Sequence, residues 1–138
     1  MSQPLRISVA IYDKDDDGSI FKHWALAIEA PEDPHKTMLL QVMGSDGRFR
    51  YEPATADVRA RPGLIQQVYL TDAAAARLNS IRDVADRVPV CNEIRGWNCQ
   101  DFVLDLLDAL EEEQVVDGVD EGYRLRRLGL QGMQEGLA

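Results

Sequence analysis

The stretch GWNCQDFVLDLLDAL, residues 96–110, predicts the best-defined helix of the chain. Asn98 is a residue type that favours the N-cap position, so we expect the helix to begin at Cys99. From Cys99 onward, apolar side chains recur at intervals of three and four residues, which is the spacing of one helical face. That face consists of Cys99, Phe102, Val103, Leu106, Leu107 and Leu110. The pattern predicts a helix that buries this face and directs the Cys99 thiol toward the core.

Five segments that precede this helix are typical of β-strands. LRISVAI (residues 5–11) alternates apolar and small or polar side chains, and the turn DKDDDGS (13–19) separates it from FKHWALAIE (21–29). This arrangement predicts an antiparallel hairpin. The segments TMLLQVMG, GRFRYEP and GLIQQVYL, at residues 37–44, 47–53 and 63–70, predict three further strands. Together they indicate a small sheet.

Two further helices complete the expected architecture. Residues 71–88 carry apolar side chains at helical spacing, with Thr71 as the expected N-cap and Pro89 as the stop. Residues 121–133 predict a weaker helix, because glycines at 129 and 132 lower its helix propensity. The fold class is therefore expected to be α+β, with one domain over residues 1–138, a length sufficient for a single core.

Composition limits the possible partners. The chain has 24 acidic and 15 basic residues and a net charge of −9, which disfavours nucleic acid. No apolar window approaches about 18 residues, so no membrane anchor is expected. Asp13, Asp15 and Asp17 have the spacing of a calcium loop, but Trp24 stands where that loop needs glutamate. We expect a soluble cytoplasmic protein with no metal and no cofactor.

Cys99 is the strongest candidate for chemistry. A thiol in the first turn of a helix lies near unpaired backbone N–H groups and the positive end of the helix dipole, and both lower its pKa. The same N–H groups can stabilise an oxyanion. The alternative is that Cys99 is an inert, buried apolar side chain.

His23 and Gln41 are the expected partners of this thiol. His23 shares a strand face with Ala25 and Ala27, whose small side chains leave room for the Cys99 helix. If the helix packs on that face, thiol and imidazole form a nucleophile–base pair. Gln41, a polar residue within an apolar run, is our candidate for orienting the imidazole. The alternatives of a core histidine and a solvent-facing glutamine stay open.

The segments KHWALAIE and NCQDFV resemble the permuted papain-like cysteine enzymes, the NlpC-type and lecithin:retinol acyltransferase-like superfamily. They are also similar to deSUMOylating isopeptidase-like proteins. The resemblance spans about residues 5 to 110 and implies a circularly permuted papain-like fold, with the nucleophile helix packed against a small antiparallel sheet. It implies Cys99 as nucleophile and His23 as base. Gln41 stands where acyltransferase-like members commonly have a second histidine, and His35 is an alternative partner.

This resemblance implies a cysteine-dependent hydrolase or acyltransferase. Its substrate would be a small molecule or peptide with an amide, peptide, ester or thioester bond, cleaved through an acyl-enzyme on Cys99. Trp97, Asn98 and Tyr12 are the expected substrate contacts. The rival hypothesis is a catalytically silent domain that serves as a binding module, and a weaker one is a redox thiol that pairs with Cys91.

Overall fold

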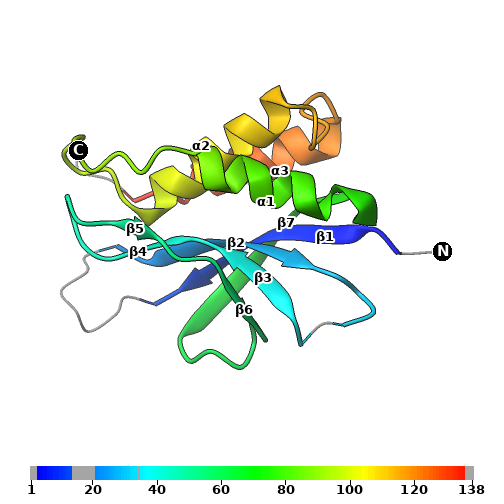
Figure 1. The fold of residues 1–138 in the computed structure, drawn as a ribbon, viewed down its shortest axis with the longest axis horizontal. Helices are drawn as coiled ribbons and strands as arrows, with labels where there is room; N and C mark the ends of the chain where they lie inside the picture. Colours follow the sequence, from blue (N-terminus) through cyan, green and yellow to red (C-terminus); the bar gives the residue numbers. More distant parts are fainter. Residues whose placement is uncertain (1–2, 14–20, 34, 136–138) are drawn as a thin grey trace.

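The computed structural model describes residues 3–13, 21–33 and 35–135. In these residues a five-stranded antiparallel sheet forms one layer, and three α-helices lie together on one of its faces (Figure 1). The strand order is β6-β3-β2-β1-β7. The strands are β1 Leu5–Tyr12, β2 His23–Glu29, β3 Thr37–Leu40, β6 Ala54–Ala56 and β7 Leu64–Ala73. The predicted α+β class and the antiparallel sheet are confirmed.

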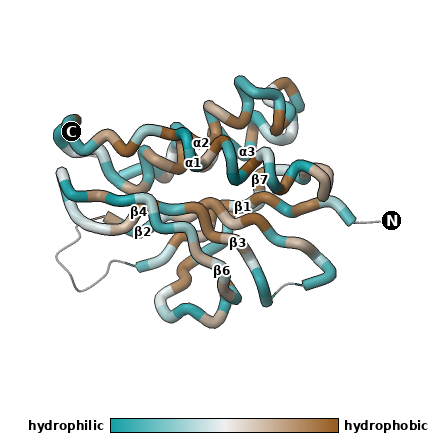
Figure 2. The backbone as a smooth tube through the Cα atoms, in the orientation of Figure 1, coloured by the Kyte–Doolittle hydropathy of each residue, from teal (hydrophilic) through white to brown (hydrophobic). Residues whose placement is uncertain are grey.

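Strand β2 lies at the centre of the sheet, and all seven of its residues are buried. Trp24, Leu26 and Ile28 belong to the core between sheet and helices, where hydrophobic residues concentrate in Figure 2. Ala25 and Ala27 point to the opposite face, in a smaller cluster. The prediction that the Cys99 helix packs on the alanine face is therefore wrong. The larger side chains of the other face offer more apolar area to bury, and burial of apolar area is the main driving force.

The helical layer follows the sheet in the chain. It consists of a 3₁₀ turn η1 Ala75–Arg77, then α1 Leu78–Arg87, α2 Cys99–Glu112 and α3 Glu121–Gln131. Helix α2 begins at Cys99 as predicted, and α1 ends before Pro89. The prediction that Thr71 caps a helix is wrong, because Thr71 pairs with Ile7 and β7 continues to Ala73. Pairing in the sheet satisfies the backbone of this segment before any helix begins.

The segment predicted as a single strand over residues 37–44 forms two strands that separate at Gln41. Strand β3 ends at Leu40, and β4 Val42–Met43 pairs with β5 Arg50–Tyr51 in a second, two-stranded sheet. Gly44 closes the turn between them at φ 125°, and a Cβ there would lie 2.6 Å from the carbonyl oxygen of Arg48. Only glycine fits this turn. The strand predicted over residues 47–53 is reduced to β5, and β6 was not predicted.

Strand β7 is the last strand of the sheet on its side, and α3 packs against it. The Arg126 side chain of α3 donates from Nε to the carbonyl oxygen of Leu70, at 2.7 Å. Its guanidinium also lies 5.0 Å from the centre of the Tyr69 ring. The pairing of β7 with β1 shifts register twice, between Ile7 and Ser8 and between Ile11 and Tyr12.

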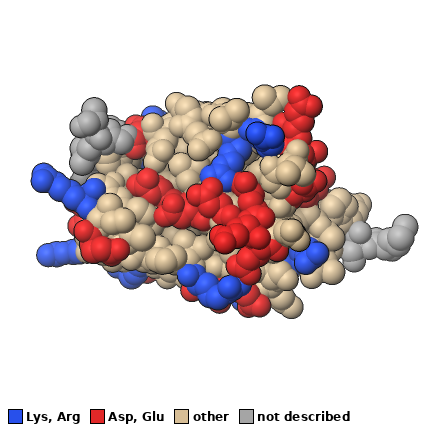
Figure 3. All heavy atoms as spheres, turned by 90° about the horizontal axis from the view of Figure 1, so that it is seen from above, with Lys and Arg blue, Asp and Glu red and all other residues tan. Residues whose placement is uncertain are grey.

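The outer surface of the helical layer carries a band of acidic side chains, visible in Figure 3. None of the helices in the described part of the chain is long and apolar enough to cross a membrane. Apart from Asp13, the turn predicted over residues 13–19 lies outside the described residues.

Leu107 tests the packing of α2 on the sheet. Its side chain is fully buried, so Leu107→Ala should lower the free energy of unfolding by about 2–5 kcal/mol. Leu128→Ala in α3 is the matched control, because Leu128 is 64% exposed and its change should stay within about 0.5 kcal/mol. Urea denaturation followed by circular dichroism measures both, and equal losses would contradict the assigned core.

Candidate active site

The start of β2 extends beyond its pairing with β3, which covers Leu26, Ala27 and Ile28. The N-terminus of α2 lies against this extension. The Cys99 thiol donates to the carbonyl oxygen of Lys22 at 3.5 Å. The backbone N–H of Trp24 also lies near enough to the sulfur to lower the pKa of the thiol. The Cys99 sulfur therefore contacts the backbone on both sides of His23.

His23 and Gln41 are brought together by the break between β3 and β4. The distance from His23 Nε2 to Gln41 Oε1 is 2.7 Å, and both side chains are buried. The Gln41 carbonyl oxygen accepts from the Glu52 backbone N–H at 2.9 Å, which fixes the residue in place. A carboxamide oxygen only accepts hydrogen bonds, so His23 Nε2 carries a proton. In the neutral ring, the lone pair that can act as a base then lies on Nδ1.

Tyr12 packs beside the imidazole. It is the cross-strand partner of His23, and the two ring centres lie 6.0 Å apart. The Tyr12 hydroxyl donates to the carbonyl oxygen of Val58 at 3.3 Å, and the Arg61 guanidinium lies 4.4 Å from the ring centre. The side chain is only 1% exposed. Tyr12 is therefore a buried neighbour of His23 in this structure, where we expected a substrate contact.

Asn98 caps α2. Its side-chain oxygen accepts from the Gln100 backbone N–H at 2.9 Å, and the Asp101 carboxylate accepts from the Asn98 N–H at 2.9 Å. This reciprocal pair is a capping box, which satisfies backbone donors that the helix itself leaves unpaired. The Asn98 amide also donates to the Gly96 carbonyl oxygen at 3.1 Å. These bonds engage Asn98 in holding the start of the helix, where we expected a substrate contact.

Trp97 is part of the core. The side chain is buried, and its ring contacts Phe49 and Phe102 edge to face. Its Nε1 donates to the Asp105 carboxylate at 3.1 Å. Trp97 therefore anchors the loop before α2 from within the core, where we expected a substrate contact.

The Cys99 thiol is neutral near neutral pH. Burial raises its pKa to about 11, although the backbone N–H groups of Trp24, Cys99 and Gln100 act in the opposite direction. The N–H groups at the helix start therefore act in the predicted direction, but the prediction of a lowered pKa is wrong, because burial outweighs them. The sulfur is largely removed from water, and loss of hydration disfavours the thiolate more than the nearby N–H groups favour it.

His35 lies away from this arrangement and pairs with Asp57. Its Nδ1 is 3.0 Å from the Asp57 carboxylate, and the side chain is exposed. The hydrogen bond from His35 is the largest of the contributions that hold the pKa of Asp57 below its ordinary value. Of the two proposed partners of His23, the structure places Gln41 in contact.

Two further residues of this region, Gln100 and Glu135, were not predicted. Gln100 is fully buried, and its Nε2 donates to the Lys22 carbonyl oxygen that also accepts from Cys99. Its place next to Cys99 in the first helical turn was an available signal. Glu135 accepts hydrogen bonds from the Lys22 N–H at 2.9 Å and from Gln100 at 3.1 Å. Its separation of 35 residues from Gln100 gives no local pattern to detect.

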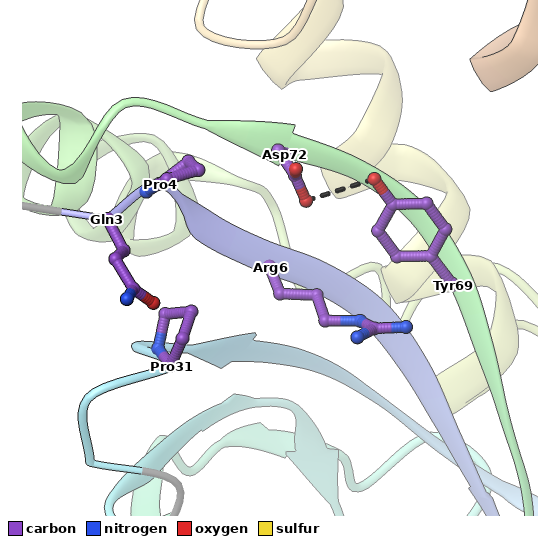
Figure 4. Close-up of a pocket in the computed structure, with 6 residues that line it drawn as sticks. All are labelled: Gln3, Pro4, Arg6, Pro31, Tyr69 and Asp72. Atoms are coloured by element: carbon purple, nitrogen blue, oxygen red, sulfur yellow. Dashed lines mark hydrogen bonds between the residues drawn. The ribbon is translucent and has the colours of Figure 1, made fainter.

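A hollow of about 400 Å³ lies elsewhere on the surface (Figure 4). It is lined by Gln3, Pro4, Arg6, Pro31, Tyr69 and Asp72. Arg6 stands near the start of β1 and Tyr12 at its end, a separation of roughly 20 Å along the strand. This hollow is therefore distinct from the Cys99 region.

Comparison with known proteins identifies one family. The model of a family of unknown function (DUF6540) matches residues 9–117, which include His23, Gln41 and Cys99. No curated protein matches the chain significantly, and no solved structure does. Helix α3 and Glu135 lie beyond the matched residues.

Asn98 tests the capping box. Asn98→Ala should lower the free energy of unfolding by about 1 kcal/mol, because it removes the acceptor for the Gln100 N–H. Asn98→Asp keeps an acceptor oxygen and serves as the matched control. Thermal unfolding followed by circular dichroism compares them, and an unaffected Asn98→Ala chain would argue against the cap.

Alkylation tests the protonation state of Cys99. Iodoacetamide reacts with thiolate, so in a Cys91→Ala background the logarithm of the rate should rise with a slope of about one between pH 7 and pH 9.5. Mass spectrometry measures the rate. A plateau that begins below pH 8 would show a lowered pKa instead.

The same pKa predicts how stability depends on pH. The folded thiol binds its proton more tightly than a thiol in the unfolded chain, whose pKa is about 8.5. This contribution to stability is complete below pH 8.5 and is lost as the pH rises toward about 11. Cys99→Ala should therefore flatten the decline in the free energy of unfolding over this interval. Urea denaturation at successive pH values measures it, and identical profiles would contradict the assignment.

Proposed function

Because the chain belongs to the DUF6540 family of unknown function, we propose its activity from the site itself: it is a cysteine-dependent hydrolase or acyltransferase. Its substrate is a small molecule or peptide whose amide, peptide, ester or thioester bond is cleaved through an acyl-enzyme on Cys99. One observation carries the proposal. The sulfur of Cys99 contacts the backbone on both sides of His23, whose Nε2 is hydrogen-bonded to Gln41.

The neutral thiol makes a base necessary. A thiol with a pKa of about 11 contains little thiolate at neutral pH, so attack requires that a neighbouring group take the proton. In the proposal that base is His23, through Nδ1. Gln41 keeps the proton on Nε2 and holds the ring in orientation, as a hydrogen-bond acceptor does in other nucleophile–histidine systems.

The proposed reaction begins when His23 removes the thiol proton while the Cys99 sulfur forms a bond to the carbonyl carbon. The carbonyl oxygen takes the displaced electron pair, and the backbone N–H of Cys99 stabilises it. The bond to the leaving nitrogen, oxygen or sulfur then breaks, and the imidazolium returns the proton to that atom. Water or another acceptor attacks the thioester, gives its proton to His23, and the sulfur leaves and recovers that proton.

The order of elements supports a papain-like, circularly permuted fold as part of the proposal. The histidine strand β2 precedes the cysteine helix α2 in the chain, and the helix begins beside that strand. Cys91 and Cys99 are both free thiols, which is compatible with the reducing cytoplasm that we include in the proposal.

A binding module without catalysis is the second candidate. The Cys99 side chain is only 7% exposed and its pKa is raised, both of which are typical of an inert core thiol. In that case the site region would serve to hold α2 against β2, and a partner would bind elsewhere.

Turnover of labelled esters, thioesters and amides tests the activity. The wild-type chain should release the leaving group and carry the acyl mass on Cys99, detected by mass spectrometry of the intact chain and its peptides. Cys99→Ala should abolish both signals. His23→Ala should lower kcat by roughly 10²–10⁴-fold, because it removes the base. Gln41→Ala should lower kcat less and change the pH profile of kcat.

His35→Ala is the matched control for the histidine, because His35 is exposed and pairs with Asp57. Its kcat should equal that of the wild-type chain. A Cys99→Ala chain that remains fully active, or an unacylated Cys99 across the whole substrate panel, would contradict the enzyme and favour the binding module.

A further inference from the structure

The segment after α3 folds back over the start of α2. The Glu135 backbone N–H donates to Gln100 Oε1 at 2.7 Å, and Gln134 donates from Nε2 to the Asp101 carboxylate at 2.8 Å. Gln100 and Asp101 are the two residues after Cys99. The chain therefore places its own side chains on the helical turn that bears the thiol.

Three donors converge on the Glu135 carboxylate. Oε1 accepts from the Lys22 backbone N–H at 2.9 Å and from Gln100 Nε2 at 3.1 Å, and the Lys22 ammonium lies 3.6 Å from Oε2. Burial opposes ionisation of this carboxyl. The hydrogen bonds from Lys22 and Gln100, together with the charge of Lys22, nevertheless hold its pKa below the ordinary value. These donors form a site that suits an ionised carboxylate.

The carboxylate site adjoins the thiol through shared groups. The Lys22 carbonyl oxygen accepts from both Cys99 Sγ and Gln100 Nε2, while the N–H of Lys22 binds Glu135. Gln100 is fully buried, so its side chain has a fixed position between the two. A carboxylate on these donors is therefore bound by Lys22, whose carbonyl oxygen accepts from the thiol, and by Gln100, the residue next to Cys99.

The ion pair between Glu135 and Lys22 is partly exposed to water and can therefore break. The side chains of Glu135 and Lys22 are 32% and 41% exposed, and ion pairs with such access to water are weak. The net charge of −9 also means that an anionic ligand gains nothing from long-range attraction. Recognition of an anion here depends on the local donors of Lys22, which directly precedes β2, and of Gln100 in α2.

We propose that Glu135 is an internal occupant of a carboxylate subsite beside Cys99, and that the substrate presents a carboxylate to Lys22 and Gln100 when Glu135 moves away. This inference rests on the proposed function. It assigns a substrate class, namely acyl compounds or peptides with a carboxylate next to the carbonyl that Cys99 attacks.

Alkylation of Cys99 tests the subsite without any need for turnover. Glu135→Ala in the full chain should raise the rate of Cys99 alkylation by iodoacetamide roughly fivefold or more, with Cys91 in the same molecule as the reference. Glu135→Gln, which keeps the shape and removes the charge, should raise it less. Glu32→Ala is the matched control, because Glu32 is exposed, and its rate should equal that of the wild-type chain.

Protection by small ligands identifies the chemistry. In the Glu135→Ala chain, N-acetylglutamate α-amide should slow Cys99 alkylation in a saturable way, and N-acetylglutamine α-amide, its neutral isostere, should not. The wild-type chain should need more ligand, because Glu135 competes. N-acetylglutamine with a free α-carboxylate distinguishes a terminal carboxylate from an acidic side chain.

Equal protection by the neutral isostere, or no protection by either carboxylate, would overturn the subsite. An unchanged alkylation rate in Glu135→Ala would show that Glu135 does not cover the thiol and would overturn its role as occupant. Both readouts are independent of substrate cleavage. If the proposed function fails, turnover is absent while carboxylate protection persists, so the two failures are distinguishable.

Discussion

The site depends on one mismatch in the sheet: β2 extends past the point where its pairing with β3 ends. Backbone N–H and C=O groups within a folded chain need partners, and sheet pairing to β3 does not provide them at this end of β2. Helix α2 fills the gap with side chains, since Cys99 and Gln100 both donate to the Lys22 carbonyl oxygen. Strand β3 ends at Leu40, directly before Gln41, and the Gln41 carboxamide is hydrogen-bonded to His23. A single break in strand pairing thus positions all three proposed catalytic residues.

Burial governs the state of the thiol. A charge at a helix terminus gains about 0.3–1 kcal/mol from the dipole, whereas removal of an ion from water costs several kcal/mol. Cys99 sits at the helix start but within the core, so the larger effect determines its protonation. A nucleophile in such a place is protected from adventitious oxidation, because oxidants react with thiolate. Under the proposed function it reacts when a neighbouring base takes its proton.

Local sequence patterns predicted the elements well and their mutual placement less well. The start of α2 followed from Asn98 and the spacing of its apolar residues, and the hairpin of β1 and β2 followed from alternation. The choice of sheet face did not, because Trp24 and Ala25 alternate and either face could have received the helix. Selection of the Trp24 face depends on the total apolar area that three helices bury together, which no local window contains.

The contact of His23 with Gln41 was anticipated for a partly mistaken reason. We expected Gln41 within a continuous strand, and the structure places it at the break that ends β3. Gln41 interrupts the run of apolar side chains in the sequence, and the strand itself is interrupted at the same residue. Glu135 lay beyond prediction, because its partners are more than thirty residues away and no periodicity links them.

Strand β7 forms one edge of the sheet, where another molecule could add a strand in concentrated solution. A ten-residue outer strand is a natural template for a strand from another molecule. The Arg126 side chain of α3 already donates a hydrogen bond to the Leu70 carbonyl oxygen. Two register shifts also make the pairing of β7 with β1 irregular. A neighbouring copy would have to displace the arginine and match an irregular ladder before it gained any hydrogen bonds. The molecule thereby resists intermolecular sheet growth at this outer strand.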